Sequence, residues 1–314
     1  MSLAQKYSIP LDWNDVHSRY TTRNFTQFLE LYKWATSFLR EPEDYALLAE
    51  DAAGALKGVG VVYAEITLSV GVMLLRKQDV AANFTAILDV FRRHAQSGTG
   101  PHVQFIFDAV RQFGAGPAME VANIAAELHN QGVVAFGLGG DELSFPLSDF
   151  RPAYKFAARQ GLHLLAHAGE TGGPEQIQDA IDLLGAERIG HGIAAIRSAA
   201  LMNTLADRKI PLEICPTSNL RTKALDIQLN SANSELSHHP LPRLLRQGIP
   251  VTLSTDDPAM FHTSLIDEYF AALQMGLSLD ELLLINRTAF EYAFLPDSAR
   301  QSFLSQLPPV AAES

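Results

Sequence analysis

The residues best suited to chemistry lie directly after short apolar runs of the sequence. One run ends at His167, with Glu170 three residues later, and the next ends at His191. Another apolar run leads into the acidic pair Asp256-Asp257, and a fourth ends in Gly139-Gly140-Asp141-Glu142. If these runs are parallel strands of a barrel, their carboxyl ends meet at one rim and the polar side chains gather there.

This group of side chains suits metal-assisted acid–base chemistry. The adjacent carboxylates of Asp256-Asp257 repel each other unless a positive charge lies nearby, which favours a bound cation. Neutral imidazole and carboxylate are suitable zinc ligands, and a glutamate three residues after a ligand histidine can transfer protons in the same pocket. Each feature alone has a simpler explanation, since strand-end histidines are mostly structural, Asp-Asp-Pro starts helices and Gly-Gly-Asp-Glu forms turns. Their joint arrival in strand order favours a site.

Seven short runs carry strand signals, and segments with helical periodicity lie between them. The runs are apolar through most of their length, as expected when both faces of a parallel sheet are buried. We predict strands at residues 60–66, 102–108, 133–138, 162–167, 188–191, 211–215 and 249–254. The predicted helices that follow the first strand are 80–97, 118–132, 240–248, 286–295 and 297–307.

The strand count leaves two α/β architectures open. A closed barrel needs eight strands, because an open parallel sheet leaves unpaired edges, whereas a doubly wound sheet of seven strands is physically acceptable. Before Gly60 the sequence offers only helical candidates, at residues 24–39 and 41–57. Because no repeat, low-complexity tract or linker interrupts the chain, residues 1–314 are predicted to form a single domain.

Composition narrows the class of partner. The chain carries a net charge of −11, which argues against a general nucleic-acid binder and favours a small-molecule ligand. No apolar run approaches the roughly 20 residues that span a bilayer, and the first residues contain no apolar signal core. We therefore expect a cytoplasmic protein without membrane association. The single cysteine, Cys215, excludes a disulfide framework and a cysteine-rich zinc site, whereas the oligomeric state leaves no signal in the sequence.

The motifs together resemble those of the adenosine deaminase family. His167-Ala168-Gly169-Glu170, Gly190-His191-Gly192 and Ser254-Thr255-Asp256-Asp257-Pro258 match the family signature in order and spacing, and residues 138–142 and 213–219 match two further family segments. The resemblance extends from about Leu3 to the final helices. It implies an α/β fold of the TIM-type (β/α)8 barrel class. It also implies hydrolytic deamination of a 6-aminopurine nucleoside, adenosine to inosine plus ammonia, by a zinc-activated hydroxide.

The resemblance also implies a role for each site residue. His167 and Asp256 are expected to be zinc ligands. Glu170 is expected to protonate the ring nitrogen next to the attacked carbon, and His191 to orient the hydroxide and stabilise charge at the tetrahedral centre. The two remaining residues, Asp257 and the backbone at Gly140, are expected to contact the purine ring.

One expected part of the family pattern has no counterpart in this sequence. The family's first strand carries His-x-His and supplies two zinc ligands, but the first histidine here is His17, which does not end a strand. Residues 3–11 instead resemble the end of the helix that follows that strand, so we expect a barrel lacking its first β/α unit in a chain that starts one unit late. Because a catalytic zinc needs three or more protein ligands, His167 and Asp256 alone predict weak or absent zinc binding and little activity.

Several residues outside these motifs receive simpler interpretations. The family has a helix over its pocket, and Phe25, Phe28, Leu29 and Tyr32 fall at its place, although their spacing fits plain core packing equally well. The remaining residues are predicted to lie outside the site: His238 and His239 at the surface, His262 in a loop, and Cys215 as a small buried hydrophobe.

Free adenine and N6-modified purine nucleotides also remain open as substrates, and three further alternatives to an adenosine deaminase remain. The first is an aminodeoxyfutalosine deaminase, acting on an adenosine-like intermediate of menaquinone biosynthesis. The second is a catalytically impaired binding relative, which the absent His-x-His favours and the retained Glu170, His191 and Asp256-Asp257 oppose. The third is a different metal-dependent hydrolase on the same fold, because one fold can host many activities.

Overall fold

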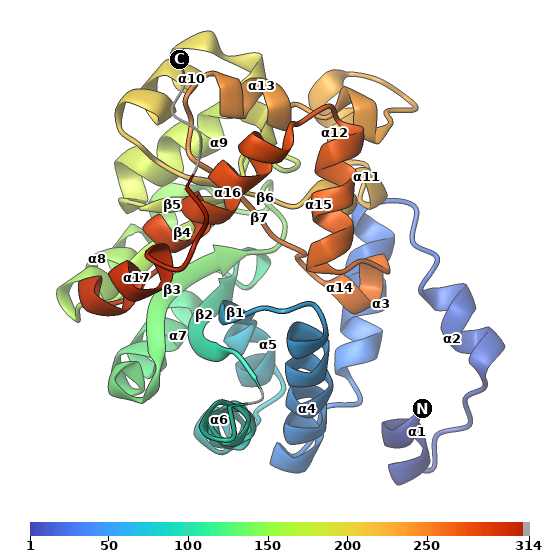
Figure 1. The fold of residues 1–314 in the computed structure, drawn as a ribbon. Coiled ribbons are helices and arrows are strands. Elements are labelled where there is room, and N and C mark those ends of the chain that lie inside the picture. Colours follow the sequence, from blue (N-terminus) through green and yellow to red (C-terminus); the bar gives the residue numbers. More distant parts are fainter. Residues whose placement is uncertain (99, 310–314) are drawn as a thin grey trace.

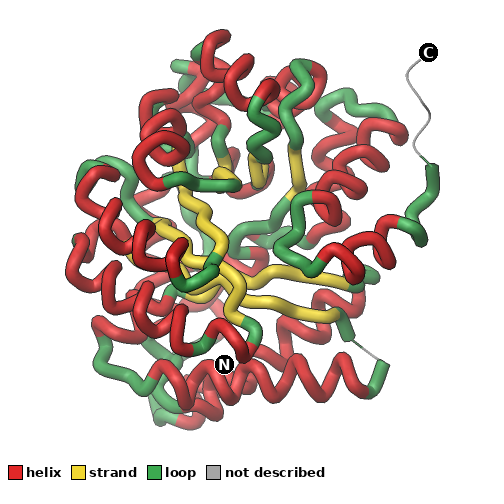
Figure 2. The backbone as a smooth tube through the Cα atoms, turned by 90° about the vertical axis from the view of Figure 1, so that its left-hand side faces the viewer, coloured by secondary structure: helices red, strands yellow, loops and turns green. Residues whose placement is uncertain are grey.

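The computed structural model describes residues 1–98 and 100–309, which form a curled parallel sheet wrapped by helices (Figure 1). Seven parallel strands lie side by side in chain order. They are β1 (Tyr63–Leu68), β2 (His102–Val110), β3 (Val133–Gly139), β4 (His163–Ala168), β5 (Arg188–His191), β6 (Leu212–Ile214) and β7 (Val251–Leu253). This sequential order is that of a TIM-type barrel, so the barrel prediction is confirmed and the doubly wound alternative, which requires a reversal of strand order, is wrong. The tube view in Figure 2 shows the strands curling into part of a barrel.

Helices occupy the segments between the strands and the region before them. Before β1 lie α1 (Ser2–Lys6), α2 (Trp13–Arg19), α3 (Phe25–Thr36) and α4 (Pro42–Gly58). Between β1 and β5 lie α5 (Val70–Leu75), α6 (Val80–Gln96), α7 (Ala115–Glu127), α8 (Arg151–Arg159) and α9 (Pro174–Asp179). The rest are α10 (Ala199–Asp207), α11 (Pro216–Arg221), α12 (Ala224–Leu229), α13 (Leu241–Arg246), α14 (Pro258–Phe261), α15 (Leu265–Gln274), α16 (Leu279–Glu291) and α17 (Asp297–Leu304). No helix among the described residues is long and apolar enough to cross a membrane.

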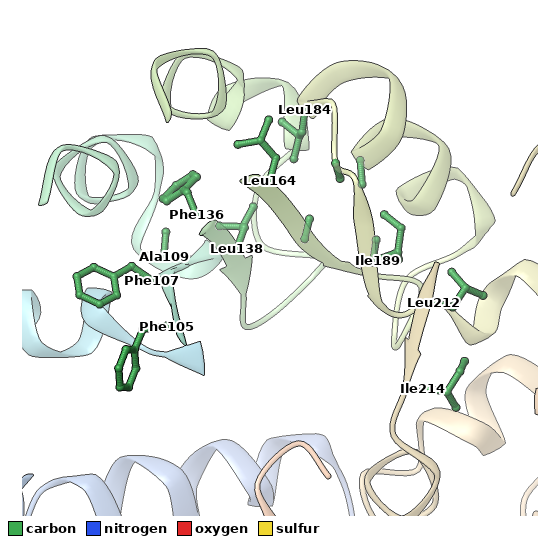
Figure 3. Packing of buried hydrophobic residues seen from close by; sticks show 14 of the residues in the cluster. Phe105, Phe107, Ala109, Phe136, Leu138, Leu164, Leu184, Ile189, Leu212 and Ile214 are labelled. Atoms are coloured by element: carbon green, nitrogen blue, oxygen red, sulfur yellow. The ribbon is translucent and has the colours of Figure 1, made fainter. Parts of the chain in front are cut away.

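The two faces of the sheet explain why the strands are apolar throughout. Side chains alternate across a strand, and in β2 Phe105 and Phe107 point outwards into the main core while Ile106 points into the barrel. Figure 3 shows the outward set, which packs between the strands and the surrounding helices. Inside, Ile106 forms a small second cluster with Ala135, Leu165 and Phe294.

An ion-pair network at the amino-terminal end of the strands links β1, β5 and β6 across the barrel interior. Arg188 at the start of β5 lies 2.5 Å from Glu65 of β1 and 2.8 Å from Glu213 of β6. Its guanidinium also lies 3.7 Å from the ring centroid of Phe294, whose backbone N–H donates to Glu65. Because β1 and β5 are four strands apart in the sheet, this contact crosses the barrel interior and joins strands that share no ladder.

Candidate active site

The predicted site residues of β4, β5 and β7 gather at the carboxyl-terminal rim of the barrel. The ligand atoms of His167, His191 and Asp256 all lie within 4.8 Å of one another. Glu170 joins them, because its Oε2 is 3.6 Å from His191 Nε2, which in turn is 3.9 Å from Asp256 Oδ2. Asp257 lies close enough that, after burial, the charges of Asp256 and Glu170 raise its pKa. The structure thus brings these five residues together, and the roles given to them above stay predictions.

Unusual backbone geometry turns two of these side chains towards the cluster. His191 and Asp256 have φ values of 60° and 56°, a left-handed conformation that non-glycine residues seldom adopt. Such strain persists only where the surroundings fix it, and it concentrates at functional sites. Asp256 is held in addition by Ser218, whose hydroxyl donates to Oδ2 at 2.7 Å.

A buried carboxylate that our sequence-based site did not include fixes the turn that carries Glu170. Both oxygens of Glu142 accept main-chain hydrogen bonds, from the N–H groups of Gly169 (3.0 Å), Glu170 (2.9 Å) and Gly172 (2.7 Å). On the other side of the turn, Gln228 donates to the carbonyls of Glu170 and Gly172. The backbone of Glu170 is therefore clamped from two directions. The signal was the Gly-Gly-Asp-Glu segment, which we predicted to reach the rim but for whose Glu142 we predicted no role.

The environment of Glu170 favours its protonated form. Its carboxyl is 5% exposed, and burial, followed by the charges of Asp256 and Glu142, raises its pKa to about 8. The hydroxyl of Thr222 lies 3.2 Å from Oε1. A raised pKa favours the protonated side chain at neutral pH, which is the form that a general acid requires.

Asp108 is a second buried acid that our sequence-based site did not include. It lies on β2, 4% exposed, and burial raises its pKa to about 7, with the nearby His167 opposing the rise. The glycines of β3 make room for it: a Cβ on Gly137 would lie 2.4 Å from Asp108 Oδ1, and one on Gly139 2.5 Å from Oδ2 and 3.3 Å from His167 Nδ1. An acid ending the apolar run of residues 102–108 was the signal that could have identified it.

Gly140 opens the loop after β3, directly following Gly139. Gly140 has φ of 95°, a conformation that favours glycine, and a Cβ there would lie 2.3 Å from Gln112 Oε1 and displace that side-chain amide. Gln112 Oε1 accepts from the N–H of Asp141, and Arg111 donates to the carbonyl of Phe145. The loop is therefore fixed by the hydrogen bonds of Gln112 and Arg111 and by those of Glu142 to the Glu170 turn.

Helix α3, the candidate for a pocket-covering helix, packs against α14. Phe28 stacks on Phe261 of α14 with ring centroids 4.9 Å apart, and α14 begins directly after Asp257. Figure 1 shows α3 beside α14. After burial, the charge of Asp257 contributes to raising the pKa of Tyr32. These contacts place the aromatic face of α3 against the segment that carries the Asp pair.

The prediction that His239 lies at the surface is wrong. His239 is 4% exposed and its Nε2 lies 3.2 Å from Oδ1 of Asn219, whose Nδ2 is 2.9 Å from Nδ1 of His191. Asn219 belongs to the matched family segment 213–219, and we predicted no role for it. A histidine in a polar segment before proline gives no local sign of burial, because packing against α11 decides it. His238, in contrast, is exposed as predicted.

The donor set fits a zinc-type cation. It offers imidazole nitrogen and carboxylate oxygen, which are ordinary zinc ligands, and Nδ1 of His167 is buried without a hydrogen-bond partner among the described residues. His191 extends the predicted pair, His167 and Asp256, to three candidate donors by distance. Cys215 is buried and its pKa is raised by burial, consistent with a packing role.

A TIM-type barrel with histidine and carboxylate donors at its carboxyl-terminal rim is the arrangement of a metal-dependent hydrolase. The family model described as adenosine deaminase matches residues 2–309. The chain belongs to the adenosine deaminase family and is an enzyme of that type.

Individual relatives agree with this membership. The chain is 37% identical over 298 residues to the aminodeoxyfutalosine deaminase of Streptomyces coelicolor, covering 93% of this chain and 74% of that protein. The crystal structure of adenine deaminase from Arthrobacter aurescens superposes with a TM-score of 0.88 at 26% identity, covering 98% of this chain and 92% of the other. An amidohydrolase from Burkholderia ambifaria with bound zinc shares the fold, with a TM-score of 0.86 at 20% identity over 98% of this chain and 84% of the other.

Proposed function

We propose that this chain catalyses the hydrolytic deamination of a 6-aminopurine nucleoside, which converts the amino-bearing carbon to a carbonyl and releases ammonia. The observation that carries the proposal is the buried Glu170, whose pKa is raised to about 8 and which lies 3.6 Å from His191. A purine must gain a proton on the ring nitrogen beside the attacked carbon. A protonated carboxyl at this position meets that need.

The roles follow from the positions of the side chains. A zinc ion held by His167 and Asp256 would supply Lewis-acid activation of water at this rim. Glu170 gives its proton to the ring nitrogen, and His191 faces the same space to donate a hydrogen bond to oxygen at the attacked carbon. Asp257, whose pKa is raised well above its usual range, can donate a hydrogen bond from its carboxyl to another ring nitrogen, and Gly140 offers backbone contact.

The second candidate function is deamination of aminodeoxyfutalosine. Similarity to the aminodeoxyfutalosine deaminase of Streptomyces coelicolor supports it, and similarity to the adenine deaminase of Arthrobacter aurescens supports adenine as a third substrate. All three compounds present the same 6-aminopurine ring to Glu170 and Asp257. The site residues therefore support deamination of all three compounds equally. The part of the pocket that contacts the substituent on N9 of the purine decides which compound is the substrate.

The test is an ultraviolet absorbance assay on adenosine, aminodeoxyfutalosine and adenine, with zinc added because two assigned ligands predict weak metal binding. We expect conversion of at least one 6-aminopurine with one ammonia per 6-oxopurine, and the ratio of kcat/KM values identifies the substrate. Glu170→Gln is expected to reduce kcat by about 10²- to 10⁴-fold, the usual contribution of a general acid. Tight binding without conversion at saturating zinc would instead support the impaired binding relative.

A further inference from the structure

A chain of three buried side chains leads from a main-chain N–H to the imidazole of His191. The side chains are His239, Asn219 and His191, which are 4%, 0% and 2% exposed. Their contacts are Leu241 N to His239 Nδ1 (3.1 Å), His239 Nε2 to Asn219 Oδ1 (3.2 Å) and Asn219 Nδ2 to His191 Nδ1 (2.9 Å). Buried polar groups of this kind need matched partners, so the donor and acceptor at each contact can be worked out from one end.

The hydrogen bond from the Leu241 N–H fixes which atom donates and which accepts at each later contact. A main-chain N–H can only donate, so Nδ1 of His239 must accept. A neutral imidazole that accepts at Nδ1 carries its proton on Nε2, and this N–H donates to Oδ1 of Asn219. Burial supports the neutral form, because it lowers the pKa of His239 to about 3.

The assignment at His239 fixes the orientation of the Asn219 amide, and with it the donor that faces His191. With its oxygen accepting from His239, its Nδ2 is the atom that faces His191, and an amide NH₂ can only donate. Exchanging the oxygen and nitrogen of Asn219 would set two N–H donors against each other at His239. His191 therefore accepts at Nδ1 and carries its proton on Nε2. That nitrogen is the one that lies 3.6 Å from Glu170 Oε2 and 3.9 Å from Asp256 Oδ2.

We propose that His239 and Asn219 are positioning residues that hold the proton of His191 on Nε2, so that His191 faces the site as a hydrogen-bond donor. The inference deepens the proposed function, on which its catalytic part rests. The proposal also excludes His191 from the three candidate metal ligands that distance alone identifies. In this tautomer His191 has no free lone pair on Nε2, and its Nδ1 is occupied by Asn219. His167 and Asp256 remain as the ligands.

Asn219→Asp is the sharpest perturbation, because it keeps the shape of the side chain and replaces the NH₂ donor by an acceptor oxygen. The expected result is transfer of the His191 proton to Nδ1. In a serine-protease triad, an inverted histidine tautomer costs about 10⁴ in kcat, and we expect a loss of at least about 10²-fold here with a small change in KM. His239→Phe removes the donor to Asn219 and should produce a mixture of His191 tautomers with a smaller loss.

The measurement is the ¹⁵N chemical shift of the histidine rings, which distinguishes Nε2–H, Nδ1–H and doubly protonated imidazole without metal, substrate or activity. His238→Phe is the matched control, since this neighbouring histidine is exposed and contacts Glu235 rather than Asn219. A wild-type His191 with its proton on Nδ1, or an Asn219→Asp protein whose His191 spectrum matches that of the wild type, would overturn the proposal. If the shifts behave as expected and no 6-aminopurine is converted, the proposed function fails and the tautomer assignment stands.

Discussion

The buried carboxyl of Asp108 makes a quantitative prediction about stability and pH. Burial raises the pKa of Asp108 from 3.8 to about 7, whereas in the unfolded chain it returns to its ordinary value. Between these two pH values the folded state binds the proton more tightly, so stability decreases as pH rises through this window. The cost is absent below pH 3.8 and reaches its maximum above pH 7.

The size of the effect follows from the two pKa values. A shift of about 3 units corresponds to a maximal cost of about 4 kcal/mol, of which about 2–3 kcal/mol develops between pH 5 and pH 8. Asp108→Asn removes the ionisation. Relative to the wild type, the variant should therefore gain about 2–3 kcal/mol in the free energy of unfolding when the pH is raised from 5 to 8.

Urea denaturation of protein stripped of metal with EDTA measures this difference at pH 5, 6, 7 and 8. Any constant effect of the asparagine on packing cancels, because only the change with pH is compared. Asp149→Asn, at an exposed aspartate, is the control and should differ from the wild type by the same amount at every pH. A pH-independent difference between Asp108→Asn and the wild type would refute the reasoning.

Three further substitutions test the parts that hold the site. Glu142→Ala leaves the three N–H groups of the Glu170 turn without their acceptor, so at about 1 kcal/mol or more each we expect a loss of about 3 kcal/mol or more in thermal or urea unfolding. Asp141→Ala, whose carboxylate accepts hydrogen bonds from Leu143 and Ser144 of its own exposed loop, should cost much less. Gly169→Ala places a methyl group 2.6 Å from Ile177 Cδ1 at φ of 75°, and the combined backbone and packing strain should destabilise by about 2–4 kcal/mol; an unchanged melting temperature would contradict this geometry. Arg188→Met leaves Glu65 and Glu213 unpaired inside the barrel, with an expected loss of about 3–5 kcal/mol that an added Glu65→Gln substitution should partly restore.

The sequence predicts the parts of the fold that depend on local pattern. Continuous apolar runs indicated all seven strands, and periodicity indicated α3, α4 and α6 close to their observed bounds. The convergence of His167, His191 and Asp256 could be anticipated, because parallel strands bring their carboxyl ends to one rim. The strand count alone could not choose between a barrel and an open sheet, since contacts across the sheet, such as that of Arg188 with Glu65 across 123 residues of chain, leave no local pattern in the sequence.

The residues that escaped prediction share a physical property. Asp108, Glu142 and His239 are polar side chains whose burial is created by other segments: the glycines of β3, the turn after β4 and helix α11 with its Asn219. A local pattern carries information about which face of an element is apolar, but not about which distant backbone N–H or amide will meet a given side chain. Their roles became visible only when donors and acceptors could be matched in space.

The most direct test of the central claim is the yield of ammonia and 6-oxopurine from a 6-aminopurine at increasing zinc concentration, measured for the wild type and for His167→Ala. We predict equal amounts of both products, formed in proportion to the zinc bound, and loss of both in the variant. No conversion by the wild type at saturating zinc, or equal rates with and without His167, would contradict the assignment of this rim as a metal-dependent purine deaminase site.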